Sequence, residues 1–162
     1  MLGLIERVLV LVDGSEESLT AAEYAILLAK RVDARLYACY VINTRAIEDL
    51  VRSRIFLEAE EREYSRDLET DADRYLNHVT RSAEQKGISV TTIRRSGNVH
   101  QEILKVADEE DVDLLVLGEL AHVRSRRDEF YDESERSMRS ARCSVLIVKD
   151  SERVDDLFQA ET

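Results

Sequence analysis

An uninterrupted apolar run near the start of the chain is the feature that most constrains its fold. Residues 8–12 read Val-Leu-Val-Leu-Val and are followed by Asp13, Gly14 and Ser15. Aliphatic side chains at every position, without polar alternation, are typical of a strand that is buried on both faces of a parallel sheet. We therefore expect this segment to be a central strand with helices on either side of it.

Helices and further strands are predicted to alternate along the rest of the chain. Helical spacing of apolar residues begins at Ser18, and Ser15 and Ser18 are candidate helix N-caps. Asn98 is expected to cap a later helix, with Gln101 three residues on as in a capping box. Four further strands are expected at residues 36–42, 88–94, 113–118 and 144–149. A long helix is expected over the apolar stripe from residue 68 to residue 83, after a shorter helix around residues 46–57.

This alternation predicts parallel βαβ units joined by right-handed crossovers. The expected fold is a single α/β domain, residues 1–150, built on an open five-stranded parallel sheet with helices on both faces. Residues 151–162 form an acidic tail, for which we expect a frayed and solvated end. The helical spacing of Val154, Leu157 and Phe158 leaves docking on the body or on a partner as the alternative.

The net charge argues against nucleic acid as a partner, and the lengths of the apolar runs argue against a membrane. The 162 residues carry a net charge of −11, which opposes binding to the phosphate backbones of DNA or RNA. The apolar run at residues 8–12 is far shorter than the ~20 residues that span a bilayer, so no membrane partner is expected. Because the N-terminal residues show no signal-peptide pattern, we expect a cytoplasmic protein.

The surface composition is acid-rich and lysine-poor. Against 34 carboxylates, the 23 basic residues include only four lysines. Both a halophilic origin and an ordinary acidic composition would produce this balance, and the sequence leaves both open. Cys39 and Cys143 are expected to be buried free thiols in a reducing compartment. The three histidines, His78, His100 and His122, are scattered, so no metal site is expected.

The carboxyl ends of the predicted strands are where a ligand is expected. In an open parallel sheet, ligands bind outside these ends, at the point where the strand order reverses. Three segments converge there: residues 12–15, residues 41–43 and the chain from Gly118 onward. At the end of a central strand, the Asp13 carboxylate could accept hydrogen bonds from an adenine or ribose edge, or could instead cap the turn that follows it.

Several segments in the same order and spacing resemble the universal stress protein family over almost the whole chain. They are VLVLVDGSEES, GNVHQEIL before DVDLLVLG, and SARCSVLIVK. The resemblance implies a Rossmann-like fold of the adenine nucleotide alpha hydrolase type and a role in stress response. It also implies that ATP or AMP is a candidate cofactor, with the adenine end of the nucleotide at Asp13 and Val41, beside Val12.

The phosphate-binding loop that the resemblance implies is altered in this chain. Family members that bind ATP carry Gly-x2-Gly-x9-Gly followed by Ser or Thr, and Gly118 matches the first of these glycines. The second and third glycine positions hold Ala121 and Tyr131, and the Ser or Thr position holds Asp132. The nearest hydroxyl side chain after it is Ser134, two residues later. The strand-one proline common in the family is replaced by Leu11. The resemblance therefore implies a degenerate ATP site.

The charge of this loop opposes phosphate. Asp132 followed by Glu135 has the pattern of a capping box at the start of the last predicted helix. The helix N-terminus that would attract a phosphate would then bind its own side chain instead. A carboxylate 4 Å from a phosphate charge costs about 4 kcal/mol at an effective dielectric near 20, whereas a helix terminus returns only about 0.3–1 kcal/mol. The loop also holds one basic cluster, consisting of Arg124, Arg126 and Arg127. These arginines could bind phosphate through bidentate hydrogen bonds, or could form ion pairs with the neighbouring acidic side chains on a solvated surface.

Two functions follow from this reading. The first is a non-catalytic, homodimeric stress-response module in which ATP binding is weak or lost, while adenosine or a monophosphate still binds beside Asp13 and Val41. The alternative is an ATP- or AMP-binding stress protein, with slow hydrolysis, that holds the phosphates through the arginine cluster. The resemblance implies a homodimer through the strand from Ser144 to Lys149, an apolar edge that would otherwise be exposed.

Overall fold

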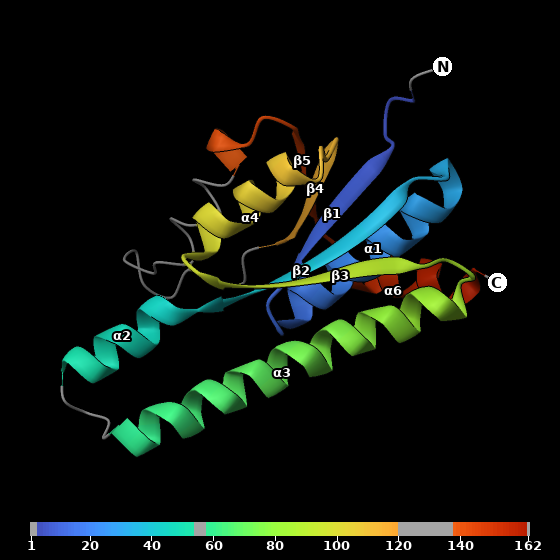
Figure 1. Ribbon diagram of the computed structural model, residues 1–162. Helices are drawn as coiled ribbons and strands as arrows, with labels where there is room; N and C mark the ends of the chain where they lie inside the picture. Colours follow the sequence, from blue (N-terminus) through green and yellow to red (C-terminus); the bar gives the residue numbers. More distant parts are fainter. Residues whose placement is uncertain (1–2, 54–57, 120–137, 162) are drawn as a thin grey trace.

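Five parallel strands form one open sheet in the computed structural model, which describes residues 3–53, 58–119 and 138–161. The strand order is β3-β2-β1-β4-β5, so the first strand is central, as the apolar run predicts (Figure 1). The strands are β1 Arg7–Val12, β2 Arg35–Asn43, β3 Val90–Gly97, β4 Leu114–Gly118 and β5 Ser144–Val148. The helices are α1 Glu16–Val32, α2 Thr44–Arg52, α3 Glu58–Gln85, α4 Val99–Glu109 and α6 Ser151–Ala160. The expected α/β architecture is confirmed.

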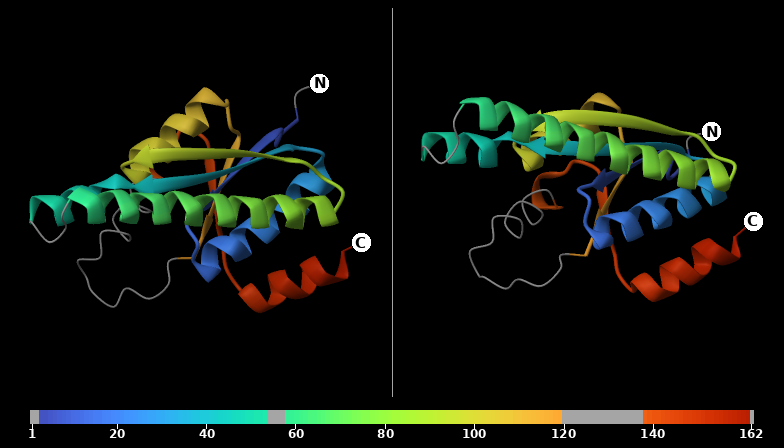
Figure 2. Two further views of the ribbon diagram at one scale, coloured as in Figure 1. Left: turned by 60° about the horizontal axis from the view of Figure 1, so that its bottom comes forward. Right: turned by 90° about the horizontal axis from the view of Figure 1, so that it is seen from below.

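The alternating side chains of β1 divide the core into two layers. Val8, Val10 and Val12 are fully buried on the face that α1, α3 and α6 cover. Leu9 and Leu11 point to the other face and pack in the cluster that includes Ile103 of α4. Helices therefore cover both faces of the sheet, as expected, with α4 opposite α1 and α3 (Figure 2). No helix among the described residues is long and apolar enough to cross a membrane.

Side-chain caps begin two helices at the positions that the sequence predicts. The backbone N–H of Ser18 donates to the Ser15 hydroxyl oxygen over 3.1 Å, which makes Ser15 the N-cap of α1. The N–H of Gln101 donates to the Asn98 side-chain oxygen over 3.0 Å at the start of α4. Each cap satisfies a backbone donor that the helix itself cannot, an effect worth about 1 kcal/mol.

The third strand begins and ends later than predicted, at Val90 and Gly97 instead of residues 88 and 94. The Ile88 N–H donates to the Ala83 carbonyl over 3.1 Å and so closes the end of α3 instead of entering the sheet. The strand continues through Arg94 and Arg95 because both remain paired with β2. Their side chains form ion pairs, Arg94 with Asp73 at 3.0 Å and Arg95 with Glu109 at 2.7 Å.

The C-terminal segment forms helix α6 on the body of the protein, so the expectation of a frayed tail is wrong for residues 151–160. The side chains of Val154 and Phe158 are 3% and 6% exposed and join the core cluster that α1 lines. Lys86 donates to the Glu161 carbonyl over 2.6 Å and lies 4.4 Å from the centre of the Phe158 ring. The apolar stripe is stable as a helix because α1 offers it an apolar surface, which the sequence of the tail alone does not reveal.

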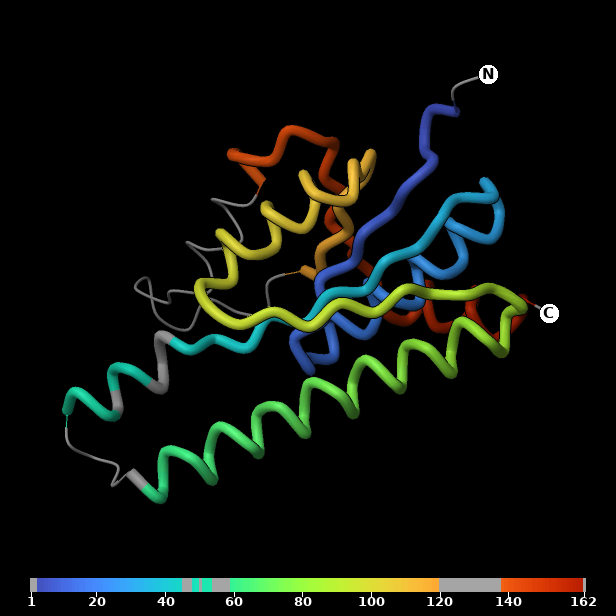
Figure 3. The backbone as a smooth tube through the Cα atoms, in the orientation of Figure 1, coloured from blue at the N-terminus to red at the C-terminus, as the bar shows by residue number. Residues whose placement is uncertain are grey.

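Helix α3 runs beneath the sheet and extends past it together with α2 (Figures 1 and 3). Its C-terminal half is the part that packs, through Ala72, Leu76, Val79 and Ala83, all at most 4% exposed. These residues lie within the stripe that the sequence predicts. The anchored half also carries Tyr75, which reaches Gly14 at the carboxyl end of the sheet.

Candidate functional site

The carboxyl ends of β1 and β4 lie side by side and form the candidate site. The two strands are neighbours in the sheet, with Val8 opposite Leu114 and Val10 opposite Val116. Helix α1, which follows β1, and helix α4, which precedes β4, lie on opposite faces of the sheet. The strand order therefore reverses between β1 and β4, which is where open α/β sheets bind ligands. Asp13 and Gly118 meet here, as the sequence predicts.

The exposed carboxylate of Asp13 organises the turn between β1 and α1. Its Oδ1 accepts hydrogen bonds from the Ser15 N–H at 2.9 Å and from the Ser15 hydroxyl at 2.5 Å. The Asp13 N–H donates to the Ser18 hydroxyl oxygen over 3.1 Å, and that hydroxyl donates to the Ser15 carbonyl over 3.0 Å. Asp13 thus caps its own turn, and its carboxylate remains exposed.

The side chains of Val12 and Val41 do not face a ligand. Val12 is fully buried against α1, and Val41 is 6% exposed on the opposite face, in the cluster that α4 lines. Both residues lie at the expected end of the sheet, but their side chains belong to the core. Any contact from these positions to a nucleotide must therefore come mainly from the backbone.

Gly118 has a packing role that the sequence analysis missed. A Cβ atom added here would lie 2.5 Å from the Glu17 carbonyl oxygen and 2.9 Å from the Ser18 nitrogen. Both are backbone atoms in the first turn of α1, and they could not move away without disrupting the hydrogen bonds of the helix. Glycine is therefore required at the end of β4 because the backbone of α1 lies directly against it, independently of any phosphate.

Two tyrosines beside the Asp13 turn were also missed as site residues. Tyr75 of α3 covers Gly14, and its ring is stacked on that of Tyr40 at 6.3 Å between ring centres. Burial raises the pKa of the Tyr40 hydroxyl, and the carboxylate of Asp13 raises it further. In the sequence Tyr75 is one member of an apolar stripe, and only its place opposite a Gly-containing turn distinguishes it.

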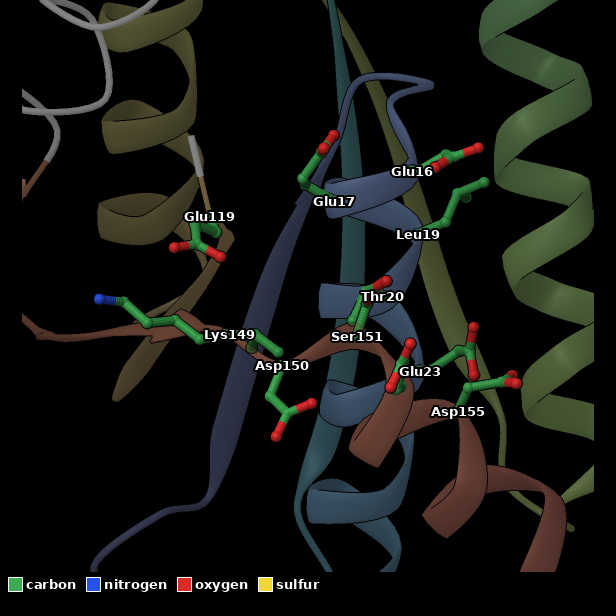
Figure 4. Close-up of a pocket in the computed structure, with 12 residues that line it drawn as sticks. Glu16, Glu17, Leu19, Thr20, Glu23, Glu119, Lys149, Asp150, Ser151 and Asp155 are labelled. Atoms are coloured by element: carbon green, nitrogen blue, oxygen red, sulfur yellow. The ribbon is translucent and has the colours of Figure 1, made fainter. Parts of the chain in front are cut away.

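A cavity of about 610 Å³, which we call the acidic hollow, opens beside the first turn of α1, the ends of β4 and β5, and α6 (Figure 4). One lysine, Lys149, and seven carboxylates line it: Glu16, Glu17, Glu23, Glu119, Asp150, Glu152 and Asp155. Burial raises the pKa of the Glu23 carboxyl, with a further contribution from Asp155, while Lys86 lowers it. The hollow is therefore a region of negative potential adjoining Gly118.

The rest of the predicted phosphate side lies outside the described residues. These positions are Ala121, Arg124, Arg126, Arg127, Tyr131, Asp132 and Ser134. Within the described ranges, no group of three or more His, Cys, Asp or Glu side chains is placed to hold a metal ion.

The close approach at Gly118 predicts the outcome of two glycine substitutions. Gly118→Ala forces a Cβ into the backbone of α1, so we expect it to lower the free energy of unfolding by about 3 kcal/mol. Gly87→Ala is the control, because Gly87 has open space around it but a left-handed backbone with φ of 78°, worth about 1–2 kcal/mol. Urea denaturation measures both variants. An equal or smaller loss for Gly118→Ala would refute the packing role.

Comparison with known proteins identifies the family. The family model described as the universal stress protein family matches residues 5–149. Universal stress protein MJ0531 of Methanocaldococcus jannaschii is 31% identical over 146 residues, covering 90% of this chain and 83% of its own.

Solved structures show the same fold. A universal stress protein family member from Burkholderia pseudomallei superposes with a TM-score of 0.71 at 21% identity, over 91% of this chain and 98% of its own. An Arabidopsis thaliana relative with AMP bound gives 0.64 at 15% identity, over 91% and 94% of the two chains. A universal stress protein in complex with cAMP gives 0.61 at 21% identity, over 89% and 96%. On the family match and the relative in M. jannaschii, this chain belongs to the universal stress protein family.

Proposed function

We propose that this protein is a non-catalytic, homodimeric stress-response module that binds ATP weakly or not at all and retains a site for the nucleoside end of AMP. The observation that carries this proposal is the negative charge around Gly118. Here the family pattern expects the first phosphate-binding glycine. Glu119 is the next residue in the chain, the backbone of Glu17 lies against Gly118, and both carboxylates line the acidic hollow.

Electrostatics decides against a polyphosphate at this end of the sheet. The N-terminus of α1 would attract an anion, but its first turn carries Glu16 and Glu17. At an effective dielectric near 20, one carboxylate about 4 Å from a phosphate charge costs about 4 kcal/mol, several times what the helix terminus returns. A triphosphate carries more charge than a monophosphate, so ATP suffers more from this repulsion than AMP does.

The nucleoside side has features that support a weak monophosphate site. Asp13 is exposed and its turn is held by Ser15 and Ser18, so a hydrogen-bond acceptor is already in place. Two relatives of the same fold are bound to AMP and to cAMP, each of which has one phosphate. These observations favour adenosine or its monophosphate over ATP.

Two groups near the centre of the sheet are poorly suited to catalysis. Burial raises the pKa of the Cys39 thiol to about 12, so the thiolate needed for nucleophilic attack is rare at neutral pH. Tyr40, whose pKa is also raised, stays neutral in the same range.

The negative charge near Gly118 should make the protein respond differently to ATP and to AMP. Millimolar Mg-ATP is expected to change the melting temperature by less than about 1 °C, whereas AMP at concentrations well above its dissociation constant raises it by a few degrees. Thermal melts with each nucleotide, together with a phosphate-release assay, make the test. A rise with Mg-ATP as large as that with AMP, or steady phosphate release, would contradict the proposal.

The outer edge of β5 supports the homodimer. Among the described strands, β5 pairs with β4 alone, and its apolar residues Val145, Leu146 and Ile147 are only half-buried. Helix α6 packs on α1, and β5 stays at the border of the sheet (Figure 1). An apolar edge strand of this kind tends to pair, and a second copy can meet it about a two-fold axis.

A charged residue on this edge is expected to separate the dimer. Ile147→Lys places a positive charge on each side of the two-fold axis, so light scattering should report the mass of one chain for this variant and of two chains for the wild type. Thr92→Lys is the matched control, since Thr92 is exposed on β3, the other edge strand of the sheet. Monomeric mass for the wild type across dilution would rule out the dimer.

A further inference from the structure

The turn that presents Asp13 contains the residue with the greatest backbone freedom. Gly14 has a φ of 84°, in the left-handed region that side chains other than glycine rarely adopt. Glycine also leaves this conformation easily, because no Cβ restricts it. The hydrogen bonds of Ser15 and Ser18 hold the turn from within, and a contact from outside the turn would restrict Gly14 further.

The ring of Tyr75 is in position to do this. A Cβ on Gly14 would lie 2.8 Å from Cε2 and 3.1 Å from Cζ of Tyr75, so the ring occupies the space where a side chain would be. The contact joins α3 to the β1–α1 turn, two segments about 60 residues apart in the sequence. The aromatic ring thus covers one side of Gly14. Backbone conformations of the turn that would enter the space of the ring are excluded.

Tyr75 is itself held firmly. The neighbouring residues Ala72, Leu76 and Val79 are buried in the core, which fixes this part of α3 against the sheet. On the other side, the Tyr75 ring lies nearly parallel to that of Tyr40, at an angle of 6°. The Arg74 guanidinium lies 5.1 Å from the centre of the Tyr75 ring and pairs with Asp71 at 3.2 Å. The ring therefore has little freedom to swing away from Gly14.

We infer that Tyr75 is a positioning residue that clamps Gly14 and thereby sets the affinity of the Asp13 turn for the adenine nucleoside. The inference rests on the proposed function for its ligand, but the clamp itself is a property of the free protein. Loss of the ring frees Gly14, loosens the bonds from Ser15 to Asp13 Oδ1, and moves the carboxylate away from its ligand-binding position.

Hydrogen exchange and AMP titration on the full chain test the clamp together. Tyr75→Ala is expected to speed exchange of the Asp13 and Ser15 amides about tenfold and to weaken AMP binding about tenfold. Tyr75→Phe keeps the ring without its hydroxyl and should restore both values to within about twofold. His78→Ala, on an exposed position of the same helix, should change neither.

The outcomes separate the clamp from the proposed function. Unchanged amide exchange in a folded Tyr75→Ala protein overturns the clamp, whatever its effect on AMP. Wild-type protein that binds no AMP overturns the nucleoside site, and the exchange data then decide the clamp alone. If circular dichroism shows that Tyr75→Ala does not fold, Tyr75→Leu, which keeps apolar volume but lacks a ring, takes its place with the same expectation and the same overturning result.

Discussion

The close packing of α1 on the end of β4 is the contact on which the carboxyl end of the sheet depends. The carbonyl of Glu17 lies where a side chain on Gly118 would be, so the first turn of α1 is drawn against the sheet. That position places the Ser15 cap and the Asp13 turn beside the switch point of the strand order. It also brings the Glu17 side chain to the edge where a nucleotide would place its phosphates.

The same packing offers a second explanation for the glycine at position 118. In the family pattern this residue opens a phosphate-binding loop, but here a steric requirement of the fold is sufficient to explain it. A chain could therefore keep Gly118 after losing affinity for polyphosphate. The carboxylates of the acidic hollow, which adjoin this glycine, are consistent with such a loss. The nucleoside end of the proposed site would depend on a different set of contacts, centred on Asp13 and the ring of Tyr75.

Periodicity predicted the fold well because burial imposes it directly. The run at residues 8–12 could only be a strand covered on both faces, and Ser15 and Asn98 are helix caps whose chemistry is local. The docking of α6 was predicted only as the alternative to a frayed end, because it depends on a surface of α1 that is distant in the sequence. The start of β3 was misplaced for a similar reason, since Ile88 is used to close α3.

The site was predicted only in part. Asp13 and Gly118 were found through their place after apolar strands, and the structure brings them together. Val12 and Val41 lie where expected, but their side chains are committed to the core. The role of Tyr75 could not be predicted, because a tyrosine in a helical stripe gives no sign of which turn it will cover. The steric role of Gly118 likewise depends on which backbone passes close to it.

Calorimetric titration of a charge-neutralised protein will show most directly whether carboxylates beside Gly118 repel polyphosphate. Glu17→Gln combined with Glu119→Gln removes two charges from the acidic hollow and leaves the backbone contact at Gly118 in place. The control is Glu63→Gln combined with Glu69→Gln, an equal change at exposed positions of α3. If they do, ATP binding should strengthen about tenfold or more in the first protein, with a smaller gain for AMP and no gain in the control. Unchanged ATP affinity in the first protein would contradict this repulsion.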